Sequence, residues 1–168
     1  LVRAVRLGEI TLDELADSLI TAAEKSPNFE TQLEKAHINF PKFESVLGPK
    51  LVSRMETFLI SRSPDDARGL KLLGSKVLGF DNEYYEKVLQ LFSLIENAEA
   101  LLSNGKEDEL VRYILKTKRL EDRKILVARY SGLLAARVEQ AQESGDLFFG
   151  LWELAEIDAF PNKIQTEK

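Results

Sequence analysis

The sequence contains no cysteine, one histidine and one tryptophan among its 168 residues. Without cysteine the chain has no disulfide scaffold, no thiolate metal site and no cysteine nucleophile. The single histidine, His37, excludes any site that needs two imidazoles from one chain. No stretch reaches the roughly 20 apolar residues that a membrane-spanning helix requires. Strand patterning is missing too, because nowhere do β-branched residues alternate with polar ones over about five positions.

The composition that remains is that of a folded protein. Apolar residues make up 44% and charged residues 30% of the chain, a balance typical of globular domains and not of disordered segments. We predict a single helical domain over residues 1–160 and a disordered polar tail over residues 161–168. We expect a soluble protein of the cytoplasm or of an organelle interior. The sequence starts at Leu1 in a helix-like stretch, so a removed targeting segment stays open.

Helix start signals recur along the chain. Thr11, with a glutamate three residues later, has the pattern of a capping box. Ser63 followed by Pro64 combines an N-cap residue with a proline suited to the first helical turn. Residues 39–49 hold two prolines and a glycine, which predicts the least regular stretch of the chain, with one short helical turn that caps the core through Phe40, Phe43, Val46 and Leu47. We expect Pro49 in the first turn of the helix that follows it.

The longest predicted helix spans residues 82–103. Apolar residues cover most of its circumference, which is typical of a buried helix. Asp81 is expected to cap its start, and Gly105 to end it in a left-handed conformation. In the helix before it, Gly69 and Gly74 indicate either the close approach of another helix or a helix that moves, and we favour close approach. The pattern as a whole predicts an all-α fold of seven or eight helices, packed as a bundle or as stacked helical hairpins around this central helix.

Patterns that resemble catalytic or metal sites have simpler explanations. Glu34 and His37 have the Glu-x-x-His spacing of di-iron bundles, but that chemistry needs the motif twice. The Asp65-Asp66 pair falls at a predicted helix start, where carboxylates interact favourably with the helix dipole. No serine stands on a nucleophile turn, and no glycine-rich loop joins a strand to a helix. We therefore predict no catalytic residue, no metal ligand and no cofactor, in a protein that is not an enzyme.

Charge is unevenly distributed in the last third of the chain. Residues 112–137 contain eight basic and two acidic side chains, and residues 138–168 contain seven acidic and two basic ones, while the whole chain carries −5. The simplest interpretation is that the two stretches meet on the folded surface and partly neutralise each other. On a predicted continuous helix over residues 121–143, Arg123 shares a face with the apolar residues. An arginine on such a face extends its charged end to solvent, pairs with a buried acid or faces a partner. We favour an intramolecular salt bridge at the end of the bundle, and the alternative is an anionic partner such as RNA, a phospholipid head group or an acidic peptide.

The segment 147–158 is the most aromatic part of the chain and predicts a helix. Phe148 and Trp152 share one face of this helix, whereas Phe149 lies on another. Tryptophan and phenylalanine are frequent anchors of protein interfaces. A terminal helix that closes a bundle has the same pattern, and we weigh that core role somewhat above partner or dimer contact.

These observations predict a non-enzymatic helical protein-interaction module, a scaffold or regulatory adaptor. Its partner is expected to be another protein or a second copy of the chain. One alternative is a phosphate- or RNA-binding module, which sparse aromatic residues and the net negative charge disfavour. The other is a bundle that binds an apolar ligand, which needs a cavity of about 300 Å³ or more. The expected contact residues, from the basic face 112–137 and the aromatic helix 147–158, are Arg112, Lys116, Arg119, Arg123, Phe148, Phe149 and Trp152.

Overall fold

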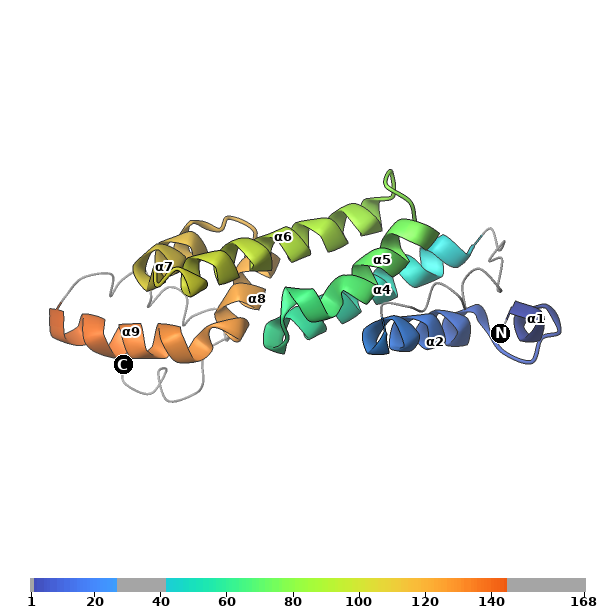
Figure 1. Cartoon of the computed structure of the whole chain (residues 1–168), viewed down its shortest axis with the longest axis horizontal. Coiled ribbons are helices and arrows are strands. Elements are labelled where there is room, and N and C mark those ends of the chain that lie inside the picture. Colours follow the sequence, from blue (N-terminus) through green and yellow to red (C-terminus); the bar gives the residue numbers. More distant parts are fainter. Residues whose placement is uncertain (1, 27–41, 145–168) are drawn as a thin grey trace. The chain divides into compact units, whose positions relative to one another are not determined.

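The computed structural model describes residues 2–26 and 42–144, and the regular structure within them is helical (Figure 1). This part of the chain holds eight α-helices and one 3₁₀ turn and no strand, which confirms the predicted all-α fold. No helix of these residues is long and apolar enough to cross a membrane. The elements are α1 (Val2–Arg6), α2 (Leu12–Lys25), α4 (Phe43–Ser61), η1 (Pro64–Ala67), α5 (Arg68–Val77), α6 (Glu83–Ser103), α7 (Glu107–Lys116), α8 (Leu120–Arg129) and α9 (Ser131–Ser144).

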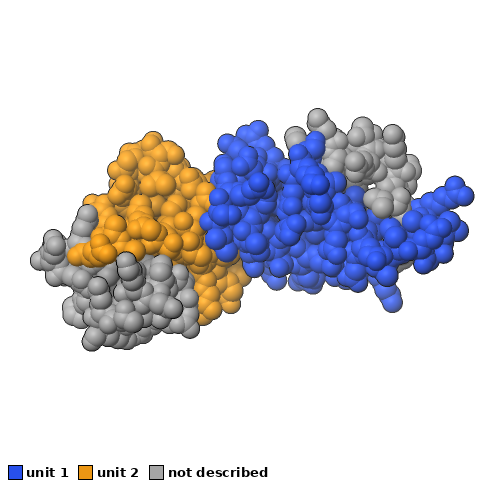
Figure 2. Space-filling model, turned by 90° about the horizontal axis from the view of Figure 1, so that it is seen from below, with its two compact units in different colours: residues 1–93 blue, residues 94–168 orange. Residues whose placement is uncertain are grey.

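The chain divides into two compact units, residues 1–93 and residues 94–168 (Figure 2). The boundary between them falls inside α6. The single domain expected over residues 1–160 therefore stays a prediction. The tail expected over residues 161–168 lies outside the described residues.

In the first unit, α2 begins with the predicted capping box. The Thr11 backbone N–H donates to Glu14 Oε2 at 2.7 Å, and the Glu14 N–H donates to Thr11 Oγ1 at 3.2 Å. Two amides that the helix start would leave without partners are thereby satisfied. The helix packs against both α4 and α5. Its buried side chains follow the helical period and are Leu15, Ala16, Leu19, Ile20 and Ala23.

Glycines in α5 allow neighbouring helices to approach closely, as the sequence predicts. A Cβ atom added at Gly69 would overlap the backbone carbonyl of Ala23 in α2. One added at Gly74 would lie 2.7 Å from a ring carbon of Tyr85 in α6. Both glycines are buried, so the absence of a side chain there makes room for a backbone carbonyl in one case and an aromatic ring in the other.

Helix α4 starts earlier than expected. It begins at Phe43, so Pro49 lies inside the helix rather than in its first turn, and the expected irregular stretch before Pro49 is helical from this residue on. An interior proline removes one helical hydrogen bond and crowds the preceding turn. Packing outweighs that cost here, because Phe43 and Leu47 are 1% and 0% exposed and Gly48 lies directly against the Tyr84 ring.

The cap of α6 differs from the prediction by one residue. Asn82 Oδ1 accepts hydrogen bonds from the backbone N–H groups of Tyr84 at 2.9 Å and of Tyr85 at 3.4 Å. Asn82, and not Asp81, is therefore the capping side chain. The chain leaves α5 through Gly79, which has a φ of +83°, and this turn sets the register that places Asn82 at the helix start.

Burial along α6 is one-sided. Glu83, Gln90 and Glu96 are exposed on the side away from the core. The helix ends as predicted, because Gly105 adopts a φ of +70° and the Lys106 N–H donates to the Leu101 carbonyl at 2.9 Å. The side chains that α6 buries are Tyr85, Val88, Leu91, Phe92, Ile95 and Ala98.

The second unit breaks the predicted helix 121–143 in two. Helix α8 ends at Arg129, Tyr130 leaves the helical conformation with φ −103° and ψ 23°, and α9 begins at Ser131. The expectation of one continuous helix is thus wrong. Serine and glycine at positions 131 and 132 have low helix propensity, and the Tyr130 side chain is fixed by a hydrogen bond to Glu99 of α6. Helix α8 packs against α7 and α9.

Candidate interaction surface

Four of the seven predicted contact residues lie in the described part of the second unit. Arg112 and Lys116 lie one turn apart on the exposed side of α7, Arg119 is exposed in the link to α8, and Arg123 is half-buried in the first turns of α8. The aromatic helix 147–158, with Phe148, Phe149 and Trp152, lies outside the described residues, as do Glu34 and His37.

Arg123 is held within the unit by backbone carbonyls. Its Nε donates to the Thr117 carbonyl oxygen at 2.9 Å, and its Nη2 donates to the Leu115 carbonyl oxygen at 3.2 Å. These carbonyls belong to the end of α7, where the last turn of a helix leaves acceptors without intrahelical donors. A cation there also interacts favourably with the negative end of the helix dipole. The favoured salt bridge is therefore not what the structure gives: Arg123 is held inside the second unit by two carbonyl groups and not by an acid.

Two further arginines of the basic stretch pair with acids that precede it in the sequence. Arg129 Nη2 lies 2.9 Å from Glu99 Oε1. Arg137 bridges two carboxylates at the start of α7, 3.1 Å from Glu107 Oε2 and 3.1 Å from Asp108 Oδ1. Part of the positive charge is thus neutralised by α6 and α7. The predicted meeting with the acidic residues beyond position 144 falls outside the described residues.

The remaining basic side chains form the exposed part of the predicted face. Within residues 2–26 and 42–144, no ion pair involves Arg112, Lys116, Lys118 or Lys124. Arg119 Nε lies 4.0 Å from Asp122 Oδ2, and more than half of its side chain is exposed. Of the basic face expected over residues 112–137, four exposed cations lie at the end of α7, in the link of residues 117–119 and in the first turns of α8.

An exposed leucine lies in the middle of this surface. Leu120, the first residue of α8, is 49% exposed. We name the group Lys116, Lys118, Arg119, Leu120 and Lys124 the basic corner. Sequence reasoning missed Leu120, because a leucine beside a polar gap carries no sign of which way it will face until the start of α8 is known.

Two tyrosines near the basic corner are engaged through their hydroxyl groups. The Tyr130 hydroxyl donates to Glu99 Oε1 at 2.7 Å, and burial together with this carboxylate raises the pKa of Tyr130 above its ordinary value of 10.0. The Tyr113 hydroxyl donates to the Leu94 carbonyl at 3.3 Å, and burial raises the pKa of Tyr113 as well. Both side chains hold α6 to the rest of the second unit.

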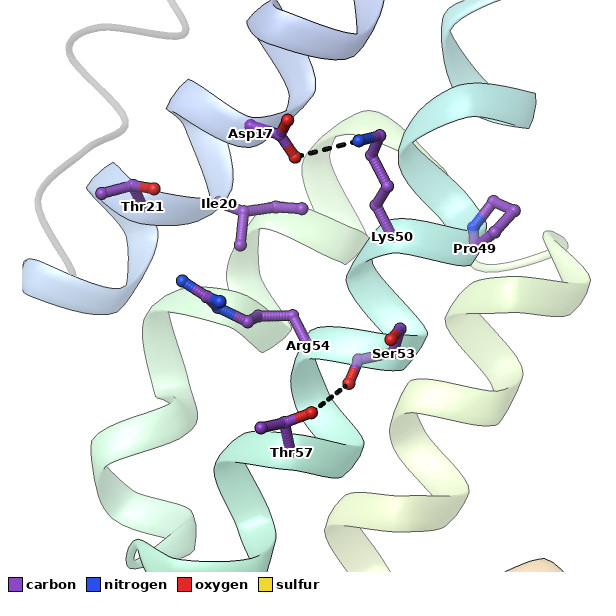
Figure 3. Close-up of a pocket in the computed structure, with 8 residues that line it drawn as sticks. All are labelled: Asp17, Ile20, Thr21, Pro49, Lys50, Ser53, Arg54 and Thr57. Carbon is purple, nitrogen blue, oxygen red and sulfur yellow. Dashed lines mark hydrogen bonds and ion pairs between the residues drawn. The ribbon is translucent and has the colours of Figure 1, made fainter.

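The first unit contains a polar groove between α2 and α4 (Figure 3). Its volume is about 490 Å³. Lys50 Nζ lies 3.0 Å from Asp17 and 3.4 Å from Asp13, and these contacts with α2 raise the pKa of Lys50. Arg54 forms an ion pair with Glu24. Both cations of the groove are thus already paired with acids of α2, and these ion pairs connect the two helices. The groove is lined by Asp17, Ile20, Thr21, Pro49, Lys50, Ser53, Arg54 and Thr57.

A second hollow of about 450 Å³ lies beside the end of α2. Its lining includes Glu24, Arg62, Asp65, Asp66 and Arg68. Both hollows are open and lined largely by charged or hydroxyl-bearing side chains. Charged side chains stand in the walls of both, unlike the enclosed apolar pockets that hold an apolar ligand.

Metal-binding residues do not gather in the described structure. No group of three or more histidine or carboxylate side chains there could hold a metal ion. Comparison with models of protein families, with curated proteins and with solved structures finds no match for the chain.

Proposed function

We propose that this chain is a non-enzymatic protein-interaction module, a scaffold or regulatory adaptor that binds its partner through the second unit. The observation that carries the proposal is the basic corner. A chain with a net charge of −5 exposes four cations within the nine residues 116–124, and it pairs Arg129 and Arg137 with its own acids. Exposed charge concentrated in this way favours association with an oppositely charged surface.

The environment of the tyrosines favours a protein over an RNA partner. Proteins that bind single-stranded RNA stack bases on accessible aromatic rings. Tyr130 is only 6% exposed, and Tyr113 is half-buried with its hydroxyl bonded to α6. Neither presents an open ring beside the basic corner, so a phosphate- or RNA-binding module stays the second candidate.

The aromatic segment 147–158, which the sequence predicts to be a helix, is the second part of the proposed contact surface. Its support comes from the sequence, which places Phe148 and Trp152 on one helical face. Large aromatic side chains dominate the binding energy of many interfaces. We propose that this helix adds apolar contact area to the charged contact made by the basic corner.

The test is partner capture by the full chain from a cell extract, quantified by mass spectrometry. The variant Lys116→Glu/Lys124→Glu reverses two cations of the basic corner, and Arg3→Glu/Lys42→Glu makes the same charge change at exposed positions of the first unit. We expect only the first pair, together with Trp152→Ala, to deplete the captured proteins. Circular dichroism checks that each variant is folded.

Two results would count against the proposal. Equal capture by the Lys116→Glu/Lys124→Glu variant and the wild type would remove the basic corner from the contact surface. Loss of the captured set after ribonuclease treatment, with binding that weakens steeply as salt rises, would favour the RNA-binding alternative.

A further inference from the structure

The geometry points to the basic corner as a docking site for a short acidic peptide segment that carries an apolar residue, and Leu120 is the contact for that residue. This inference rests on the proposed function and names the chemistry of the partner. It uses the exposure of Leu120, the cations around it and the rigidity of the link between α7 and α8.

Leu120 is unusual within its own unit. A single exposed leucine is common on protein surfaces and needs no explanation by itself. In the described part of the second unit, however, Leu120 is the only large apolar side chain that is exposed. It also stands at the first position of a helix, next to the link of residues 117–119.

Cations surround Leu120 because of chain connectivity. Lys118 and Arg119 precede it directly, and Lys116 ends the helix before. Lys124 lies one turn further on and on the same face of α8. All four are exposed. Arg119 is the only one of the four with an ion pair among the described residues, 4.0 Å from Asp122. Glu121, directly after Leu120, is exposed too, so four cations outnumber two acids in the sequence around Leu120.

The corner is fixed before any partner binds. Arg123 donates to the carbonyls of Thr117 and Leu115 at 2.9 and 3.2 Å. The Thr117 hydroxyl donates to the Tyr113 carbonyl at 2.8 Å. These contacts hold the link from inside and leave the side chains of the basic corner pointing outward. A contact surface that is already ordered loses less conformational entropy on binding.

Charge complementarity selects an acidic peptide as the occupant. An apolar anchor ringed by charged groups matches the usual arrangement of binding hot spots, in which the rim excludes water from the central contact. A membrane surface would take up several apolar side chains of one helix face together. The corner offers only Leu120, which fits one apolar residue flanked by acids.

The test is fluorescence anisotropy with the full chain and three labelled synthetic peptides. The first is a 12-residue peptide of glutamate and aspartate with leucine and phenylalanine at its centre, the second replaces both by serine, and the third replaces every acid by lysine. We expect the first peptide to bind, the serine peptide to bind about tenfold more weakly, and the lysine peptide not to bind.

Substitutions then distinguish the apolar contact of Leu120 from the charge contact of the lysines. Leu120→Ser should weaken binding of the first peptide about tenfold and leave its salt dependence unchanged. Lys118→Glu/Lys124→Glu should weaken binding and flatten the salt dependence, because the charge contact is reversed. Ile60→Ser is the matched control, since Ile60 is 37% exposed in the first unit, and it should bind like the wild type.

Several outcomes would overturn the inference. Equal binding of the leucine-phenylalanine and serine peptides, or wild-type binding by Leu120→Ser, would show that Leu120 is not an anchor. Binding to phosphatidylserine–phosphatidylcholine vesicles without binding to any peptide would assign the corner to an anionic lipid surface. If no peptide binds while Lys116→Glu/Lys124→Glu still depletes captured proteins, this inference fails and the proposed function stands.

Discussion

Single atoms set the distance between neighbouring helices at the glycines of the first unit. At Gly69 the space of a side chain is taken by a carbonyl oxygen of α2, and at Gly74 by the ring of Tyr85. A carbonyl group is part of the backbone and cannot rotate aside as a flexible side chain can. Among the described glycines, Gly69 is the one where an added Cβ would come closest to another atom, and that atom belongs to the backbone.

We expect Gly69→Ala to lower the free energy of unfolding by about 1–3 kcal/mol, because the added methyl group forces α2 and α5 apart. Gly132→Ala is the matched control. Gly132 lies in α9 with no atom within 4 Å of an added Cβ, so alanine there should raise stability by up to about 0.5–1 kcal/mol. Urea unfolding followed by circular dichroism measures both. If Gly69→Ala leaves the free energy of unfolding unchanged, α2 moves aside without loss of stability.

The hydroxyl of Tyr130 gives the second unit a dependence on alkaline pH. Burial and the Glu99 carboxylate raise the pKa of Tyr130 above 10.0. Below pH 10 the hydroxyl is protonated in both the folded and the unfolded chain, and its full contribution to stability is present. Above pH 10 the unfolded chain loses this proton while the folded chain keeps it, so stability falls as pH rises.

We expect this loss to reach about 1.4 kcal/mol per pH unit above pH 10. Tyr130→Phe lacks the ionisable group, so the stability difference between wild type and variant should shrink between pH 9 and pH 11. Guanidinium chloride unfolding at a series of pH values measures the difference. Tyr113 is retained in both proteins, and its own titration cancels. A difference that stays constant across this range would contradict the prediction.

At the scale of elements, the end of α7 depends on a side chain from α8. Arg123→Ala removes two hydrogen bonds from a charged donor to carbonyls of α7. We expect the free energy of unfolding to fall by about 1–3 kcal/mol. Lys124→Ala, next to it in sequence and exposed, should change stability by less than about 0.5 kcal/mol. Thermal unfolding of the two variants compares them, and equal melting temperatures would refute the capping role.

Local signals predicted those elements whose ends are fixed by their own residues. The capping box at Thr11, the serine cap at Ser63 and the left-handed end at Gly105 depend on contacts within three to five positions, and all three are present. The close approach at Gly69 and Gly74 was also predictable, because an interior helical glycine has few other purposes.

The features that the sequence did not reveal depend on contacts between elements. Pro49 lies inside α4 because the turns before it bury Phe43 and Leu47, and no local rule weighs that burial against the missing hydrogen bond. The break after α8 depends on Tyr130 reaching Glu99, 31 positions away. The candidate surface was predictable as a basic stretch, but not its division into paired arginines and an exposed corner around Leu120.

At the scale of the whole molecule, α6 connects the two compact units. It is 21 residues long and has buried side chains on both sides of the boundary, Val88 in the first unit and Ile95 in the second. A helix that loses the packing of one half loses part of the support for the other, because helical stability in proteins comes mostly from tertiary packing. If residues 1–160 form a single domain, as predicted, a substitution that destabilises one unit should also destabilise the other.

We expect Gly69→Ala, in the first unit, to lower the free energy of hydrogen exchange at the amides of Leu126 and Val127 in α8 by the amount measured for global unfolding. If an amide exchanges only when the whole molecule unfolds, its free energy of exchange equals the free energy of global unfolding and falls by the same amount. Native-state hydrogen exchange with mass spectrometry measures this. Arg123→Ala, in the second unit, is the converse test and should lower protection at Leu19 in α2. If each substitution reduced protection only in its own unit, the two units would unfold separately, and the boundary inside α6 would be a boundary between domains.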